Sequence, residues 1–174
     1  MKRSAWLILF LCLPAIFAGC GQIAADEQEM VQIMAQKNGI YDEASMRAAG
    51  TVELGDTMLM LVLTGNDNQG YTFFADEFKH RANQYTFIHS YKLIERGINM
   101  ASLMWADGYV FLSNNESSKN LQIRFPNGKK EDELIAIDSI PFVYYLDLSE
   151  AYTDNDAFSF EYYFLNENGE VISQ

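Results

Sequence analysis

The apolar residues of this chain follow a helical period near the start and an extended pattern over most of its length. Within residues 26–37, three apolar side chains recur at the i, i+3, i+4 spacing of an α-helix: Met30, Ile33 and Met34. Asp26 is placed to cap the first turn, and Asn38-Gly39 is a typical helix end. The pattern therefore predicts one short amphipathic helix over residues 26–37.

From residue 51 onward, short apolar runs alternate with turn residues, as antiparallel strands do. Ala106-Asp107-Gly108 separates two such runs, and Asp-Gly in this position is a strong hairpin signal. Residues 40–50 are ambiguous, and the polar residues within 75–82 favour a helical turn or a loop. We predict strands at residues 51–54, 57–64, 71–74, 84–95, 100–105, 109–112, 121–125, 133–137, 141–148, 158–165 and 170–172.

Two of these runs, TMLMLVLT at residues 57–64 and FVYYL at residues 142–146, are apolar on both faces. A strand with one solvated face normally alternates, so the second face of these strands needs a cover. The helix at 26–37 is the local candidate, and a partner or dimer mate is the alternative. We expect a mainly β fold, with α+β as the alternative: an antiparallel sheet, forming a sandwich or a curved sheet, with the N-terminal helix packed on it.

The first twenty residues have the layout of an export signal. Two basic residues precede a nearly continuous apolar run at residues 5–18, and small residues then lead to Cys20. A helix needs about 20 apolar residues to span a bilayer, whereas this run is shorter and contains Pro14. A cleaved signal peptide is therefore favoured over a retained membrane anchor.

This segment resembles the signal peptide of bacterial lipoproteins, with Phe17-Ala18-Gly19-Cys20 as the lipobox and Phe17 where Leu is usual. The resemblance implies cleavage before Cys20, a diacylglyceryl group on its thiol, often acylation of the new amino group, and a place on the extracytoplasmic side of the cell membrane. Two or more acyl chains anchor a protein stably. We expect a signal peptide at 1–19, a lipidated tether at 20–25, and a single β-rich domain at 26–174.

Cysteine and charge narrow the classes of function. Cys12 would leave with the signal peptide, so the mature domain has no disulfide, no thiolate metal site and no Cys nucleophile. The chain has 12 basic and 24 acidic residues; cleavage removes two basic residues and no acid, which takes the net charge from −12 to −14. So acidic a domain repels nucleic acid, and we expect no such partner. Solubility at a cell surface explains the charge, with a cationic partner or a loosely held divalent metal as the alternative.

Candidate chemistry is sparse. His80 and His89 are too few for a typical zinc site, and His89 lies in an alternating strand. Asp154-Asn155-Asp156 and residues 65–70 are rich in oxygen ligands, but neither matches the spacing of an EF-hand, and turns favour these residue types anyway. No G-x-S-x-G elbow is present. We therefore predict no catalytic residue, cofactor or metal ligand; Cys20, as the lipidation site, is the one functional residue predicted.

Aromatic residues are abundant, with 12 Phe and 10 Tyr. They have two interpretations: the lining of a groove for an apolar or carbohydrate ligand, or the filling of a β core with hydroxyls at its edge, which we favour. The residues concerned are Tyr85, Phe87, Tyr91, Trp105, Tyr109, Tyr144, Tyr145, Tyr162 and Tyr163.

The mature sequence is similar to small lipoproteins of unknown function from Gram-positive bacilli. The shared features are a short helix after the lipidated Cys and a β-rich domain that ends in a hairpin around the sequence NENGEV, residues 166–171. No activity follows from this similarity. We favour a non-enzymatic binding or accessory module at the cell surface. The alternatives are a cell-envelope hydrolase that uses carboxylates or His80 and His89, and a carrier of a small apolar ligand between sheet and helix.

Overall fold

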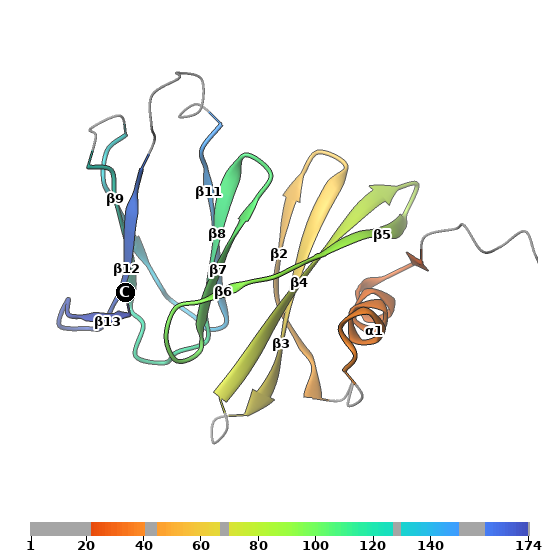
Figure 1. Cartoon of the computed structure of the whole chain (residues 1–174), viewed down its shortest axis with the longest axis horizontal. Helices are drawn as coiled ribbons and strands as arrows, with labels where there is room; N and C mark the ends of the chain where they lie inside the picture. The colour runs from red at the N-terminus through yellow and green to blue at the C-terminus, as the bar shows by residue number, and fades with distance from the viewer. Residues whose placement is uncertain (1–21, 41–44, 67–69, 127–129, 150–158, 174) are drawn as a thin grey trace, which may run out of the picture.

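A computed structural model describes residues 22–40, 45–66, 70–126, 130–149 and 159–173. These residues form one helix and three antiparallel sheets, stacked face to face in the order helix, first sheet, second sheet, third sheet (Figure 1). The chain runs from α1 at one end of the stack to β13 at the other, with two exceptions: β1 joins the first sheet before α1, and β11 returns from the third sheet to the second. The prediction of a mainly β fold with antiparallel sheets and a packed N-terminal helix is confirmed.

The first sheet has the strand order β1-β5-β4-β3-β2, the second β11-β8-β7-β6 and the third β10-β9-β12-β13. The strands of the first sheet are β1 (Ile23–Ala24), β2 (Arg47–Leu54), β3 (Thr57–Asn66), β4 (Gly70–Arg81) and β5 (Gln84–Tyr91). Those of the second are β6 (Ile94–Glu95), β7 (Met100–Trp105), β8 (Gly108–Ser113) and β11 (Phe142–Asp147). Those of the third are β9 (Asn120–Arg124), β10 (Glu133–Ala136), β12 (Glu161–Leu165) and β13 (Val171–Ser173).

Helix α1 (Glu27–Asn38) forms where the apolar period predicted it. An Asp26 carboxylate oxygen accepts a hydrogen bond from the Glu29 amide at 2.9 Å, which satisfies a donor of the first turn. Gly39 ends the helix in the left-handed region, with φ of 68°. The helix buries its apolar face against the first sheet through Met30, Ile33, Met34 and Ala35.

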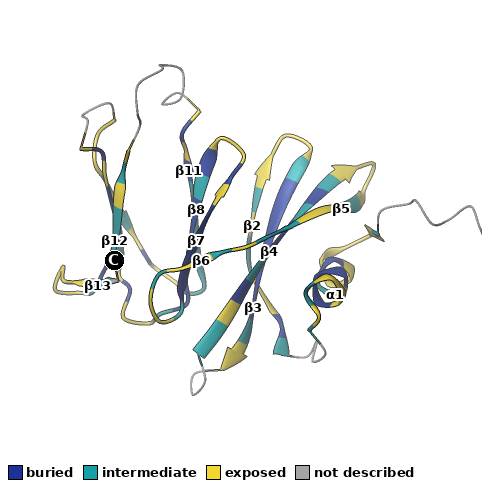
Figure 2. Ribbon diagram, viewed as in Figure 1, coloured by how far each residue is buried: buried dark blue, intermediate teal, exposed yellow. Residues whose placement is uncertain are grey.

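Strand β3 is buried on both faces, which explains its continuous apolar run. Its even-numbered side chains pack under the helix: Met58, Met60 and Val62. Its odd-numbered side chains pack against the second sheet: Leu59, Leu61 and Leu63. The predicted cover by the helix is thus confirmed for this strand, and Figure 2 shows the resulting buried interior along β3, β7 and β8.

The second apolar run, β11, is covered by another part of the same chain. Val143 and Tyr145 face the first sheet, whereas Tyr144 and Leu146 face the third. The third sheet therefore covers the second face of β11, the face for which the sequence allowed a partner or dimer mate as the cover. A third apolar core forms between the second and third sheets, around Phe111, Leu121, Ile123 and Phe164.

The structure corrects two predictions of secondary structure and assigns one stretch that is ambiguous in the sequence. Residues 75–82 are not a helical turn or loop: β4 continues to Arg81, because β3 and β5 pair with it on both sides there. Its acids are tolerated because Asp76 accepts hydrogen bonds from Asn38, and Glu77 accepts one from Tyr91. The ambiguous stretch 40–50 contributes the start of β2, and the run 84–95 divides into β5 and β6, which belong to different sheets.

Candidate functional site

A cleft opens where β5 leaves β4. Strand β4 pairs with β3 over its whole described length except its last two residues, from Asn66↔Gly70 to Thr57↔Lys79. Strand β5 pairs with β4 only as far as Ala75↔Tyr91, and the chain then crosses into the second sheet as β6. In the described part of the chain, residues 70–74 of β4 therefore have a strand neighbour on one side only.

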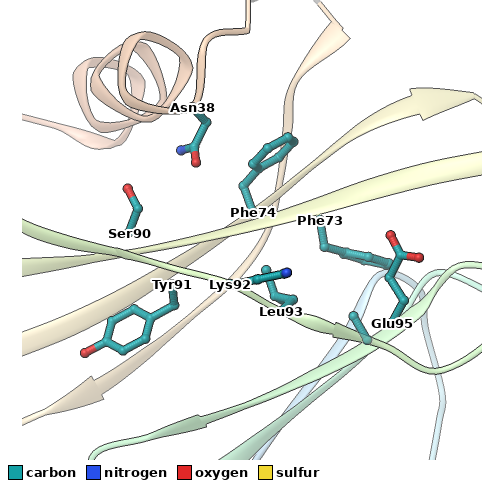
Figure 3. A pocket seen from close by; sticks show the side chains of 9 residues that line it. Asn38, Phe73, Phe74, Ser90, Tyr91, Lys92, Leu93 and Glu95 are labelled. Atoms are coloured by element: carbon teal, nitrogen blue, oxygen red, sulfur yellow. The ribbon is translucent and has the colours of Figure 1, made fainter.

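The cleft between the diverging strands has a volume of about 420 Å³ (Figure 3). Its walls come from α1, β4, β5, β6 and β7 and from the crossover between β5 and β6. The lining residues are Asn38, Phe73, Phe74, Ser90, Tyr91, Lys92, Leu93, Glu95 and Ala101. A second hollow of about 620 Å³ continues along the open edge of β4 and shares Phe73 and Glu95 with the first. Together they form one groove beside β4.

A buried carboxylate lies behind one wall of the cleft. Asp76 is fully buried between α1 and the first sheet, and the Asn38 side-chain amide nitrogen lies 3.3 Å from each of its carboxylate oxygens. The Ser90 hydroxyl also donates a hydrogen bond to it. Burial raises the pKa of Asp76 above its usual value, while the donors Ser90 and Asn38 oppose that rise. Two of the cleft's polar side chains are thus held in place by an acid that solvent does not reach.

The Tyr91 phenol closes the opposite wall as a neutral group. Its hydroxyl donates to a Glu77 carboxylate oxygen at 2.6 Å. Burial and this carboxylate together raise the pKa of Tyr91 to about 12, so the phenol keeps its proton at neutral pH. In Figure 3 the Tyr91 ring points away from Asn38 and Ser90, which point toward each other from α1 and β5. Tyr91 therefore acts as a wall of the cleft and as support for Glu77.

Lys92 and Glu95 are the charged residues of the lining, and both are solvent-exposed. Within the described part of the chain, neither forms an ion pair. The remaining lining side chains are mainly apolar, with Phe73 and Ala101 buried. The cleft thus combines an apolar floor with a few convergent polar groups, which is the usual make-up of a small-molecule site.

The structure does not bring the two histidines together. His80 stacks on Tyr85, with ring centroids 4.6 Å apart, and Tyr85 packs in the core under α1. His89 meets Tyr91 edge-on at 4.8 Å, and Tyr91 packs in the core between the first and second sheets. The histidines therefore lie on opposite faces of the first sheet, where they cannot act on one substrate.

The acidic loops lie largely outside the described residues, which exclude 67–69 and 150–158 and with them Asp154-Asn155-Asp156. Among the residues that are described, no group of three or more His, Cys, Asp or Glu side chains is arranged to hold a metal ion. Asp147, at the start of one such loop, instead accepts a hydrogen bond from the Ser149 amide at 2.8 Å. This is the turn role that Asp commonly has.

The aromatic residues fill the cores, as favoured from the sequence. They are distributed over all three: Tyr85 and Phe87 under the helix, Trp105 and Tyr145 between the first two sheets, and a third group of Tyr109, Tyr144 and Tyr162. Of the nine residues considered for a groove, only Tyr91 lines the cleft. Tyr163 lies instead beside the Arg124 guanidinium, 5.6 Å from its ring centroid.

Cys20 and the rest of residues 1–21 lie outside the described residues, so the lipidation site remains a prediction. The described chain begins at Gln22, whose side chain donates a hydrogen bond to Gln36 of α1 at 2.9 Å. Its carbonyl accepts a hydrogen bond from the Phe87 amide of β5. The segment that follows Cys20 is thus held at the helix end of the stack. In the described part of the chain, no helix is long and apolar enough to cross a membrane.

Sequence reasoning missed the residues that form the cleft. In the sequence, Asn38 indicates only a helix end, and the polar residues around Asp76 favour a loop or turn. A usable signal was present: Asp76 is an acid inside the apolar run of residues 71–78, at the same parity as Phe74. An acid on a buried strand face needs partners, and this points to a polar cluster.

Comparisons with protein-family models, with curated proteins and with solved structures found no match to this chain.

Proposed function

We propose that this protein is a lipid-anchored binding module of the cell surface, with no enzymatic role, that holds a small ligand in the cleft beside Asp76. The observation that carries the proposal is the buried cluster of Asp76, Asn38 and Ser90 directly behind an open cleft. Burying a carboxylate is costly, and an apolar residue on this strand face would pack under α1 without that cost. The buried Asp76 carboxylate orients Asn38 and Ser90 toward a ligand, and this role explains why an acid occupies the position.

The anchor in this proposal is the lipobox-like segment that ends at Cys20. Gln22 is attached to α1 and β5, so a lipid on Cys20 would hold the helix end of the stack nearest the membrane. The third sheet would then be the outermost layer. The exposed first turns of α1 carry Glu27 and Glu29, and these acids would repel an anionic membrane surface. The domain would thus stand off the membrane on its short tether, with the cleft accessible.

The test is ligand retention by the native protein. We would extract the full chain from its own membranes and identify co-purified small molecules by native mass spectrometry. A Glu95→Trp variant fills the cleft from an exposed position, and Glu53→Trp on β2 is the matched control, because Glu53 is an exposed glutamate on a strand away from the cleft. We expect a bound molecule in the wild type and the control that is absent from Glu95→Trp. Equal retention by all three proteins, or by none, would reject the cleft as the binding site.

A further inference from the structure

The hydrogen bonds behind the cleft determine which polar atoms face a ligand. The Asn38 side-chain nitrogen donates to the Met34 carbonyl at 2.9 Å and to the two Asp76 oxygens at 3.3 Å. An amide nitrogen has two hydrogens, and both are used in this way. The reverse orientation would set the amide oxygen against a carboxylate, which is repulsive. The Asn38 Oδ1 atom is therefore left as an acceptor.

Ser90 likewise offers the cleft a hydrogen-bond acceptor. Its hydroxyl donates to Asp76, so the oxygen retains only lone pairs for the cleft. Lys92 follows directly after the end of β5, two residues beyond Ser90, and lines the same cleft. The lining of the cleft thus includes two acceptors, Asn38 Oδ1 and Ser90 Oγ, and one cationic donor, the Lys92 ammonium, whose side chain extends toward Phe73 (Figure 3).

We infer that the cleft takes a small zwitterion of the α-amino-acid type with an apolar side chain, an inference that rests on the proposed function. Its ammonium group would donate to Asn38 and Ser90, its carboxylate would meet Lys92, and its side chain would lie among Phe73, Phe74 and Leu93. Charge complementarity supports this class of ligand. The lining carries one cation, Lys92, and one anion, Glu95, so a ligand of no net charge fits the cleft better than an anion or a cation.

Size agrees with this class of ligand. The cleft volume of about 420 Å³ lies near the lower end of the range of roughly 300–1,000 Å³ for small-molecule sites. Apart from Glu95, the walls nearest the open edge of β4 are aromatic or aliphatic, and the buried ones, Phe73 and Ala101, cannot solvate a second charged group. A short unbranched or branched aliphatic side chain is therefore the expected tail.

The test compares norleucine with two probes that each lack one of its charged groups. Norleucine carries both charges, hexanoate lacks its ammonium group, and pentylammonium lacks its carboxylate. Each would be titrated into the ¹⁵N-labelled full chain in phosphatidylcholine nanodiscs, with the backbone amides of Ser90 and Phe73 as reporters. We expect norleucine to bind about tenfold more tightly than either single-charge probe, since each charged hydrogen bond contributes about that factor.

Variants separate the two halves of the ligand. Lys92→Met is expected to abolish the advantage of norleucine over pentylammonium and to leave pentylammonium binding unchanged or tighter. Lys119 is an exposed lysine outside the cleft, so Lys119→Met is the matched control. It is expected to change the affinity for neither norleucine nor pentylammonium. Ser90→Ala is expected to weaken norleucine and pentylammonium and to spare hexanoate.

Two results would overturn the inference. If hexanoate or pentylammonium binds as tightly as norleucine, the cleft does not select a zwitterion, although it still binds a ligand as proposed. If no probe shifts the Ser90 or Phe73 amide, the ligand class is wrong, and the proposed function is then decided separately by the Glu95→Trp comparison.

Discussion

The side-chain amide of Asn38, the last residue of α1, donates hydrogen bonds to both carboxylate oxygens of Asp76 at 3.3 Å. This contact joins the end of the only helix among the described residues to the middle of a central strand. It lies directly behind the cleft, so the same interaction stabilises the helix on the sheet and orients a cleft side chain. A structural role and a binding role are therefore coupled at Asn38.

Removal of this amide should destabilise the domain. We predict that Asn38→Ala lowers the free energy of unfolding by about 1–3 kcal/mol, because Asp76 stays buried with one donor fewer. Gln32→Ala, at an exposed position of the same helix, should change it by less than about 0.5 kcal/mol. Urea denaturation monitored by circular dichroism measures both. Equal effects of the two substitutions would mean that the Asn38–Asp76 contact contributes nothing to stability.

Asp76 should also give the stability a specific pH dependence. Burial raises its pKa in the folded state above the usual value of 3.8, so the folded protein keeps this proton to a higher pH than the unfolded chain does. The contribution of Asp76 to stability is therefore greatest below pH 3.8 and falls as the pH rises through the folded-state pKa.

Asp76→Asn removes the titrating group with little change of shape. We predict that wild type loses stability relative to Asp76→Asn as the pH rises from below 3.8, measured by urea denaturation at a series of pH values. A stability difference that is constant with pH, or that changes with the opposite sign, would show that Asp76 is not buried as described.

The two faces of β3 should be equally intolerant of truncation. Met60 packs under α1 and Leu59 against the second sheet, and both are fully buried. We predict that Met60→Ala and Leu59→Ala each lower the free energy of unfolding by about 2–5 kcal/mol. A thermal or urea melt of each variant tests this directly. A mild effect of Met60→Ala alone would indicate that the helix does not cover this face.

Gly108 should resist substitution for a steric reason. It lies in β8 next to Tyr145 of β11, and a Cβ atom at this position would overlap the Tyr145 ring. We predict that Gly108→Ala destabilises the domain by about 1–3 kcal/mol through this overpacking. Tyr145→Leu in the same chain should recover part of the loss, and urea denaturation of the single and double variants measures the coupling. Additive effects would exclude the contact as the cause.

The sequence predicted the elements well where one physical signal dominated. The helix period around Met30 and Met34 and the Asp107-Gly108 turn are local signals, and both elements formed. The doubly apolar run of β3 correctly implied a cover on each face. Prediction failed at residues 75–82, because Asp76 is stabilised by Asn38, a residue 38 positions away in the sequence. The cleft was missed for the same reason, since it depends on where β5 separates from β4, and no local pattern encodes that point.

Attachment of the protein to the membrane through Cys20 is the central proposal. The direct test is intact-mass spectrometry of the full-length gene product extracted from its native membranes, followed by sequencing of its N-terminal peptide. We predict a chain that begins at Cys20 and carries the added mass of two or more acyl chains. A chain that still begins at Met1, or one cleaved elsewhere with an unmodified Cys20, would contradict it.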